Sequence, residues 1–413
     1  MATASILATL QQGLQKASVR FDHVEVCYVA HHLLGIRVAD SRVCRENVLR
    51  NGEELFLTGF YEGRTGRKSL LWQDADGIAK ELNQFHRELA SASPDPECVV
   101  PAPQQGEDGN QAEAAALMDT VNIEELYQGI GKGIAAVKAQ GLRLTGYVEI
   151  QKRDVTKVCG SGFVMRHSDS GAQISFTVDD WDNGLSGVGY RSLGMPSLQH
   201  GIGEAVQSAI REAQMFCTAG GSKRDVPAGD YDVILTPAAV YDILKTMLFY
   251  GFLDQRKIDE GRTYLSHNQP QFSKALQLSV GGTHPELAPD PLRNGHSVPC
   301  QPMQIMGEGQ IQDAFISPFW AKKTHRAETF EPHFLPAIDF KVVANSPHEG
   351  IDLYSGLEAM IAATERGLLV VDTWYLRLVT EMDGMITGMT RDGLLLVEDG
   401  KIVAPLGHLR WHE

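Results

Sequence analysis

Two residue patterns come closest to metal chemistry, and neither completes a metal site. His348-Glu349 starts like HExxH, the zinc-peptidase motif in which two imidazoles one helical turn apart hold zinc beside a carboxylate that activates water. The following residues supply no second histidine, and the proline and glycine on either side favour a turn. His200 and Glu204 stand four residues apart on an expected helix, but such a pair is more often a solvated polar face. The sequence therefore predicts no metal site on either pattern.

One candidate nucleophile is the thiol in Cys159-Gly160-Ser161-Gly162. A catalytic thiol needs a base that removes its proton, and no histidine is adjacent in sequence. A small buried cysteine at the end of a strand is therefore the favoured interpretation. The GxSxG nucleophile motif is absent, and Ser161 and Ser186 are expected in turns. His31-His32, His325 and His333 are expected to be satisfied or exposed imidazoles.

Two further patterns point away from ligand binding. Gly129, Gly131 and Gly133 have a GxGxG spacing, but they lie inside a helical pattern rather than between a strand and a helix, which rejects a phosphate-binding loop. The acidic groups Asp179-Asp180-Trp181-Asp182 and Asp259-Glu260 lack the spacing of a calcium loop. Both acidic groups are expected to be solvated turns.

Composition limits the partners and the compartment. The 413 residues are 43% apolar, which predicts a globular chain of two or three domains. Because 52 acidic residues outnumber 37 basic ones, the formal charge of −15 disfavours nucleic acid and anionic membranes as ligands. The six cysteines are widely spaced without a CxxC pair, as in reduced thiols. The opening residues make a poor signal peptide, and no run approaches the roughly 20 apolar residues that a membrane span needs. We therefore expect a soluble cytoplasmic protein.

The elements predict an α+β fold whose first domain spans residues 1–217. A helix on Ile6, Leu10 and Leu14 precedes an antiparallel meander over residues 21–73, and a second helix runs to Ala90. Residues 93–116 are rich in proline, glycine and polar side chains and predict a mobile loop. Helix, strands and helix then return between residues 126 and 210. The order of elements predicts a pseudo-duplication, although no residue-level repeat is found.

A second domain is predicted over residues 218–413. Glycine, proline and charge replace periodic apolar spacing at residues 218–230, and a strand follows over residues 232–235. Thr236-Pro237 predicts a helix start, because the hydroxyl can cap an amide and proline loses no hydrogen bond there; the helix should run to about Tyr250. Asp399-Gly400 between apolar runs predicts a type I′ hairpin. The remaining segments indicate a β-rich, barrel-like domain.

Two C-terminal segments resemble the TldD/PmbA family, also called TldD/TldE. They are residues 227–267, starting PAGDYDVILTPAAVYDILK, and residues 367–410, which contain TWYLR, TGMTRDG and EDGKI. The N-terminal region follows the family's order of elements through residues 21–72 and the loop at 93–96. The resemblance therefore covers almost the whole chain.

The resemblance implies a subunit of a heterodimeric metallopeptidase. TldD subunits of this family carry HExxxH on the helix after the proline-alanine-valine segment, together with a downstream cysteine, and TldE subunits carry neither. The corresponding residues 241–250 contain no histidine here, and Lys245 would repel a dication. The chain therefore resembles the TldE-like subunit, with no catalytic or metal-binding residue of its own. Zinc is expected in a TldD-like partner, and the substrate is expected to be an unfolded or extended peptide, cleaved for proteolysis or peptide maturation.

Five residues are the candidates for lining the peptide cavity. An extended peptide can pair its backbone with an exposed strand edge, and the C-terminal motifs place these side chains near such strands: Tyr375, Arg377, Thr390, Arg391 and Asp392. The alternative interpretation is structural, because Arg391-Asp392-Gly393 is a turn-forming sequence and Trp374 could fill the barrel.

Two other functions remain open from the residues. The chain could be an enzyme in its own right with a diverged site, using His325, His333 or His348 and a cysteine. It could also be a homodimer that captures peptides without hydrolysis.

Overall fold

The computed structural model describes residues 3–48, 52–108, 121–194, 198, 200–226, 228–267, 269–280, 301–329, 338–342 and 353–412. Its first part contains two rounds of helix, strands and helix, as the sequence predicts. The first round comprises α1 (Thr3–Lys16), β1 (His23–Ala39), β2 (Arg42–Val48), β3 (Gly52–Tyr61), β4 (Arg64–Leu71) and α2 (Ala75–Ser91). The second comprises α4 (Ile123–Ala139), β6 (Arg143–Cys159), β7 (Val164–Asp180), β8 (Leu185–Gly194) and α6 (Ile202–Thr218).

The two rounds join into one sheet, which we call the N-terminal sheet. Its strand order is β4-β3-β1-β6-β7, with β2 added beside β1 and β8 beside β7. The central pair, β1 and β6, is antiparallel over a long register that runs from Glu25 opposite Cys159 to Val38 opposite Gly146. The predicted meander over residues 21–73 is therefore too simple. A single 17-residue strand, β1, pairs with β3 along its first half and with β2 along its second.

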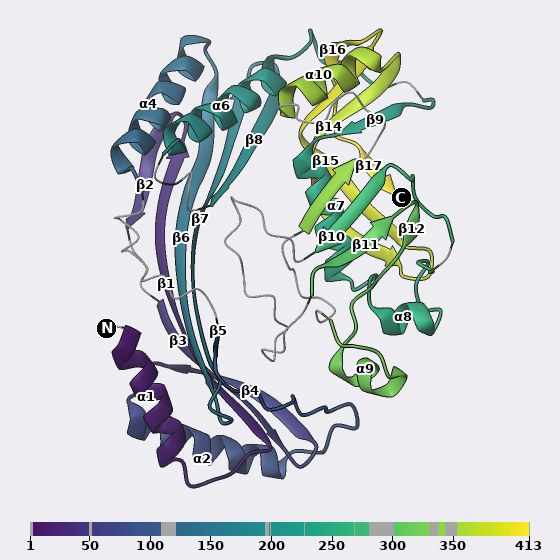
Figure 1. Ribbon diagram of the computed structural model, residues 1–413. Coiled ribbons are helices and arrows are strands. Elements are labelled where there is room, and N and C mark those ends of the chain that lie inside the picture. Colours follow the sequence, from purple (N-terminus) through teal and green to yellow (C-terminus); the bar gives the residue numbers. More distant parts are fainter. Residues whose placement is uncertain are drawn as a thin grey trace.

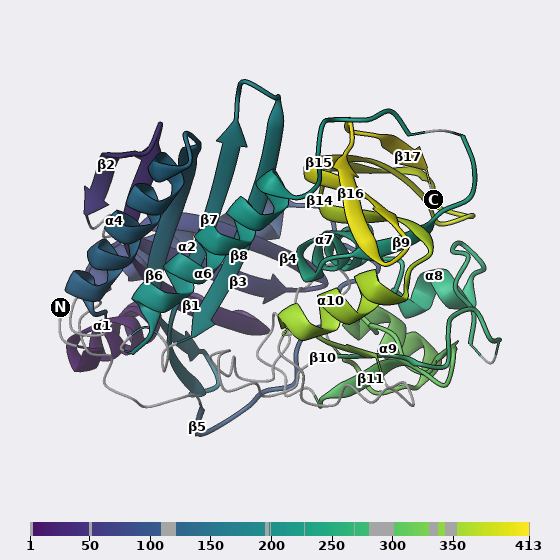
Figure 2. The ribbon, with the colours of Figure 1, turned by 90° about the horizontal axis from the view of Figure 1, so that it is seen from above.

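Alternation of side chains along β1 and β6 decides which face the helices cover. Even-numbered apolar residues of the first half of β1, such as Val24 and Val26, pack with α1 and α2. Even-numbered residues of its second half, such as Ile36 and Val38, pack with α4 and α6. Because successive strand residues point to opposite faces, both helix pairs cover the same outer face. The odd-numbered residues point to the inner, concave face, toward the C-terminal part (Figures 1 and 2).

The predicted loop at 93–116 is described as far as Asp108, and residues 109–116 lie outside the described part. Its end forms a two-residue strand, β5 (Glu107–Asp108), parallel to β7, where the proline-rich composition predicts no regular structure. Earlier in the loop, the Asp95 amide donates to the Gly63 carbonyl at 2.9 Å. The Glu97 carboxylate accepts two hydrogen bonds from Arg256, at 2.8 and 2.9 Å. The loop is thus tied to both parts of the chain.

The C-terminal part is rich in strands, and those that the structure describes form two open sheets rather than the predicted barrel. One sheet has the order β12-β11-β10-β13, and the other β16-β15-β14-β9 with β17 beside β15. The strands are β9 (Asp232–Leu235), β10 (Leu276–Val280), β11 (Met303–Gly307), β12 (Gln310–Ile311), β13 (Ile338–Val342), β14 (Arg366–Thr380), β15 (Met385–Glu398), β16 (Lys401–Pro405) and β17 (Arg410–His412). The helices are α7 (Pro237–Phe249), α8 (Gln255–Asp259), α9 (Pro318–Thr324) and α10 (Leu353–Ala363).

Two local predictions in this part are confirmed. The Thr236 hydroxyl accepts from the Ala239 amide at 3.4 Å, and α7 begins at Pro237. Asp399 and Gly400 have φ values of 49° and 73° between β15 and β16, as a type I′ hairpin requires.

The two parts are joined by a shared apolar cluster. Val188 of β8 and Phe216 of α6 pack with Ile234, Leu369 and other residues of the second sheet. The division at residues 217 and 218 stays a prediction. None of the helices that the structure describes combines the length and apolar character needed to span a bilayer. None of the five described cysteines is in a disulfide, and Cys300 lies outside the described residues.

Candidate functional site

A cleft of about 610 Å³ lies where the concave face of the N-terminal sheet meets β15. Its walls come from the second half of β1, the first half of β6, β7 and β8, and from two residues of β15, Arg391 and Asp392. Elements far apart in the sequence thus converge on one hollow. Two of the five predicted site residues line it.

Arg391 and Asp392 form a local charged pair at this edge. The Arg391 Nε lies 3.0 Å from Asp392 Oδ2, and its guanidinium stands over the Trp374 ring at 5.3 Å. Asp392 has φ of 47°, a left-handed conformation that aspartate tolerates better than most residues. Its other oxygen accepts a 3.5 Å hydrogen bond from Ser186, which lies in β8 rather than in the predicted turn. Both charges are therefore held by contacts across the cleft edge.

A buried carboxylate lies behind this pair. Asp372 of β14 is only 6% exposed, and it accepts a 3.1 Å hydrogen bond from the Tyr190 hydroxyl of β8. Burial raises the pKa of Asp372 to about 6, and the charges of Asp242 and Asp392 add to this increase. Burial and Asp372 together raise the pKa of the Tyr190 phenol. The Asp372 carboxyl can therefore gain or lose a proton near neutral pH, while the Tyr190 phenol keeps its proton and donates the hydrogen bond.

Two more carboxyls extend the acidic region. Burial followed by the charge of Asp392 raises the pKa of Asp179, at the end of β7. Burial raises the pKa of Asp242 on α7, which accepts a 3.5 Å hydrogen bond from Thr373. The inner surface here is acidic and partly dehydrated, an arrangement suited to cationic or hydrogen-bond-donating groups.

The other three predicted residues are not brought into the cleft. Tyr375 has φ of 57°, lies in a bulge of β14 and is 52% exposed. The Arg377 guanidinium covers its ring at 4.4 Å. Thr390 is buried, and its hydroxyl accepts from the Leu409 amide at 2.9 Å, which is a structural contact. Trp374 is 53% exposed, so the alternative that it fills a core is wrong.

The resemblance found in the sequence implies that a zinc motif, where present, would lie on helix α7, and the side chains of this helix do not fit a metal. Lys245 places its ammonium 5.8 Å from the centre of the Tyr241 ring, one turn away. Asp242 is the one carboxylate between residues 237 and 249 and is engaged by Thr373. One carboxylate beside a lysine offers no imidazole or thiolate ligand set for zinc.

The remaining sequence candidates have ordinary surroundings. His200 is exposed and precedes α6, so it is not on the expected helix, and Glu204 pairs with Arg211 instead. His31 and His32 are near Glu54 and Asp154, with N to O distances of 4.0 and 3.9 Å. His325 ends α9. His333 and His348 lie outside the described residues.

The two acidic patterns differ from each other. The turn comprises residues 181–184, so only Trp181 and Asp182 of the first pattern lie in it, while Asp179 and Asp180 end β7. The Arg143 guanidinium lies over the Trp181 ring at 4.1 Å. Asp259 is not a solvated turn residue. It accepts hydrogen bonds from the Trp320 indole at 2.8 Å and from Arg326 at 2.7 Å, which hold α9 to α8.

The sequence analysis missed Asp372 and Tyr190. A signal was present for Asp372, because it is the one charged residue in the run from Gly367 to Leu376. A carboxylate inside a strand of such apolar character is expected to be buried and to need a partner. No sequence pattern links it to Tyr190, since the contact depends on how the two sheets meet.

Comparison with protein families identifies the C-terminal part of the chain. Residues 228–413 match the model of the PmbA/TldA metallopeptidase C-terminal domain. The resemblance to the TldD/PmbA family found in the sequence is thereby confirmed for residues 228–413, which form a PmbA/TldA metallopeptidase C-terminal domain.

Solved structures show the same fold over almost the whole chain. TldE from Thermococcus kodakarensis is 14% identical, with a TM-score of 0.75, over 99% of this chain and 91% of that one. A putative modulator of DNA gyrase from Bacteroides thetaiotaomicron is 15% identical, with a TM-score of 0.72, over 98% and 89%. A similarly described protein from Thermotoga maritima is 13% identical, with a TM-score of 0.71, over 95% and 88%. No curated protein matches the chain in sequence.

Proposed function

We propose that this chain is a TldE-like subunit that completes the chamber of a zinc peptidase and binds unfolded peptide, while a TldD-like partner supplies the zinc. The observation that carries the proposal is the absence of zinc-binding side chains from α7 and from Tyr250, which follows it. Residues 237–250 contain no histidine, and Lys245 puts a positive charge where a dication would have to bind. A chain with this helix cannot hold zinc in the family's manner.

The cleft supports a role in peptide binding. Among the described residues, β8 pairs in the sheet with β7 alone, and its other backbone edge is where we propose that an extended chain binds. Asp392 and Arg391 stand beside this edge and offer one acceptor and one donor to a peptide backbone or to its side chains. Backbone pairing gives affinity with little sequence preference, which suits a peptidase of unfolded substrates.

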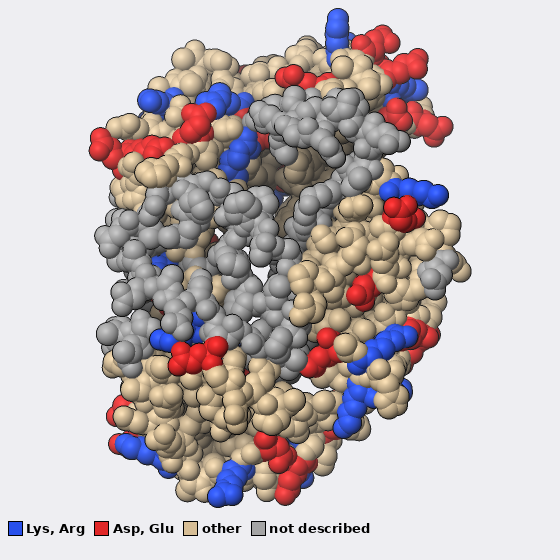
Figure 3. Space-filling model, in the orientation of Figure 1, with Lys and Arg blue, Asp and Glu red and all other residues tan. Residues whose placement is uncertain are grey.

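The surface charges agree with a peptide rather than nucleic acid as the ligand. On the face drawn in Figure 3, the described Lys and Arg residues are interspersed with Asp and Glu and do not gather into a basic patch. A polyanion would find no continuous binding surface there. The described thiols without disulfides fit a reducing compartment, and we place the complex in the cytoplasm.

The experiment is reconstitution. The chain is purified alone and together with a TldD-like subunit from the same genome, and hydrolysis of an unfolded casein is measured with and without a chelator. We expect no hydrolysis by the chain alone and chelator-sensitive hydrolysis by the pair. A partner whose zinc-binding histidines are replaced is the matched control. Chelator-sensitive hydrolysis by the chain alone would contradict the proposal, and peptide binding unaffected by the partner would favour the homodimer.

A further inference from the structure

A second group of chemically capable side chains lies at the opposite end of the concave sheet face. Glu25 of β1 and Cys159 of β6 are register partners in the central antiparallel pair, so their side chains project from the same face. His23 is two residues before Glu25 and therefore shares that face. Within the described residues, these three side chains are the only group of at least three His, Cys, Asp or Glu residues placed so that they could bind one metal ion. Their ligand atoms all lie within 4.8 Å of one another.

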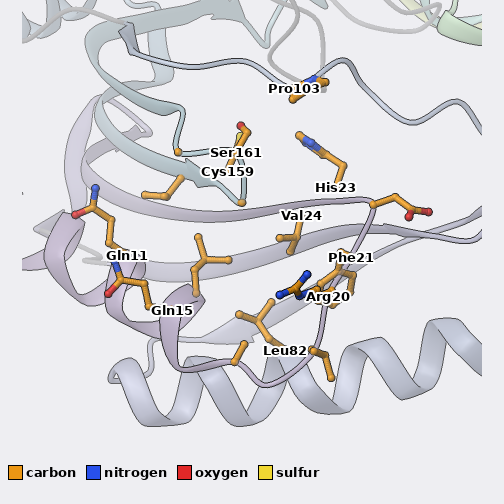
Figure 4. A pocket seen from close by; sticks show the side chains of 17 residues that line it. Gln11, Gln15, Arg20, Phe21, His23, Val24, Leu82, Pro103, Cys159 and Ser161 are labelled. Carbon is orange, nitrogen blue, oxygen red and sulfur yellow. The ribbon is translucent and has the colours of Figure 1, made fainter.

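The sequence argument against a reactive Cys159 was that no histidine is adjacent to it along the chain. The fold supplies one from the neighbouring strand. Figure 4 shows the His23 ring on the same side of the sheet as Cys159 and Ser161, while Val24 points to the helices on the other side. The prediction that Cys159 is buried at a strand end is confirmed, since it is the last residue of β6 and 3% exposed.

The three side chains are buried and partly pre-oriented. His23, Glu25 and Cys159 are 8%, 2% and 3% exposed. Glu25 Oε1 lies 3.2 Å from the His23 ring nitrogen Nε2, and Glu25 Oε2 lies 3.0 Å from the Lys157 ammonium. Each oxygen of the carboxylate therefore has a distinct partner.

This arrangement matches the preferences of one class of ion. Imidazole nitrogen, thiolate sulfur and a carboxylate oxygen are the ligands of zinc, and catalytic or exchangeable zinc sites use three protein ligands. Glu25 can give Oε1 to a metal while Oε2 stays with Lys157. Lys157 then acts as an outer partner that fixes the carboxylate, as such partners do in metal sites.

The space beside the cluster provides room for a fourth ligand. A cavity of about 630 Å³ at this end of the sheet is lined by His23, Cys159 and the turn from Gly160 to Gly162, together with residues of α1 and α2 such as Leu14 and Leu82. The Gly160 amide donates a 2.8 Å hydrogen bond to the Val24 carbonyl, and Ser161 follows in the turn after β6. The Ser161 hydroxyl oxygen is buried and has no hydrogen-bond partner. An unsatisfied buried hydroxyl calls for a ligand or a water at this point.

We propose that His23, Glu25 and Cys159 bind a Zn²⁺ ion whose fourth position opens to this cavity beside Ser161. The charges define that fourth ligand. Zn²⁺ and Lys157 bring three positive charges, and the Glu25 carboxylate and Cys159 thiolate bring two negative ones. The surplus of one positive charge favours a small anion, such as hydroxide, carboxylate or azide, in the open position.

This ion is separate from the zinc of the proposed peptidase complex. His23 begins β1, whereas the cleft is lined by Gly35 to Arg37 near the far end of the same strand. A 12-residue separation along an extended strand corresponds to about 40 Å. The chain can therefore bind a metal ion without hydrolysing peptide. A negative result for this metal site would leave the proposed TldE-like role untouched, and the reverse also holds.

The test is cobalt substitution in the full-length chain. Metal is removed with a chelator, the chelator is removed, and Co²⁺ is titrated while the near-ultraviolet and visible spectra are recorded. We expect one Co²⁺ per chain, a thiolate-to-cobalt charge-transfer band, and a change in the visible bands when azide is added. Zn²⁺ should displace the Co²⁺ and remove these bands.

Matched variants identify the ligands. Cys159→Ser should abolish the charge-transfer band, and His23→Gln should weaken Co²⁺ binding by more than about tenfold. Cys27→Ser is the neighbouring control, because Cys27 lies opposite Lys157 on the same face, and Cys217→Ser is the distant one. Both controls should keep the band. Circular dichroism and melting curves confirm that each variant folds. Absence of the band in folded wild-type chain, or its persistence in Cys159→Ser, would overturn the proposal.

Discussion

The Tyr190 hydroxyl donates a 3.1 Å hydrogen bond to Asp372 Oδ2, and this contact joins β8 of the N-terminal sheet to β14 of the second sheet. The two residues are 182 positions apart in the chain. The carboxylate is buried near two other acidic groups, Asp242 and Asp392. Its ionisation therefore lowers the stability of the junction between the two sheets, which also forms the cleft.

The first prediction concerns the pH dependence of stability. Burial raises the pKa of Asp372 to about 6. A carboxyl whose pKa is higher in the folded than in the unfolded chain destabilises the fold as the pH rises from about 4 to about 6, by roughly 2–3 kcal/mol in total. Asp372→Asn removes this cost and keeps an acceptor for Tyr190. We expect the variant to match the wild type at pH 4 and to be more stable at pH 7.5, as measured by urea unfolding.

Two comparisons make this prediction specific. Asp182→Asn changes an exposed carboxylate in the turn after β7 and should leave the pH dependence unaltered. Tyr190→Phe should lower the free energy of unfolding of the wild type by about 1–3 kcal/mol at pH 7.5, because it leaves a buried carboxylate without its hydrogen-bond donor. The loss should be smaller in the Asp372→Asn background. Equal pH profiles for the wild type and Asp372→Asn would rule out the buried charge as the cause.

The second prediction uses the glycines of α4. A Cβ on Gly129 would meet the backbone of Gly203 at 2.7 Å, whereas a Cβ on Gly131 meets nothing within 4 Å. Gly129→Ala should therefore force α4 and α6 apart and destabilise the protein by about 1–3 kcal/mol. Gly131→Ala should stabilise it by up to about 1 kcal/mol, because alanine favours the helix. Thermal melting of the two variants checks this; a shift of the same sign in both would contradict it.

These glycines also show what the sequence could and could not predict. Their helical context excluded a phosphate loop correctly, because local periodicity depends only on near neighbours. That Gly129 and Gly133 face α6 while Gly131 faces solvent follows from packing between segments about 75 residues apart. Local patterns likewise predicted α7 and the hairpin at Asp399, where a cap and a turn act within a few residues.

Non-local pairing accounts for the rest. Polar residues in the middle of β1, such as His31, interrupt its apolar pattern. The apolar runs on either side of them were therefore predicted to be separate strands. His23 and Cys159 are 136 positions apart, and only the register of β1 against β6 brings them together. The barrel was predicted from strand content alone, which cannot distinguish one closed sheet from two open ones.

A third prediction tests the cleft in the reconstituted complex. Asp392→Asn keeps the left-handed backbone, since asparagine tolerates it, but removes the charge that faces Arg391. Arg391→Ala removes the donor. Both should raise KM for an unfolded peptide severalfold with kcat little changed, because the role we propose for these groups is to bind substrate away from the partner's zinc. Arg211→Ala, on the exposed face of α6, is the control. A fall in kcat at constant KM would show that these residues act in the chemical step instead.

The last prediction concerns assembly. Large apolar side chains are exposed along the β14–β15 hairpin, at 53% for Trp374, 51% for Val379, 57% for Met382 and 37% for Met385. Aromatic and methionine side chains are enriched at protein interfaces, and so concentrated a group on one hairpin is expected to be covered by a partner.

If the TldD-like subunit covers this hairpin, Trp374→Ser combined with Val379→Ser should weaken the heterodimer by at least tenfold. Truncating a central aromatic anchor typically costs about 2 kcal/mol or more. Analytical ultracentrifugation of the mixed subunits measures the loss, and peptide hydrolysis should fall in parallel at limiting concentration. Trp181→Ser is the matched control, because Trp181 is 69% exposed in the turn between β7 and β8, outside the hairpin. Dissociation of a homodimer by the double variant, with heterodimer formation intact, would instead identify a second copy of the chain as the partner on this surface.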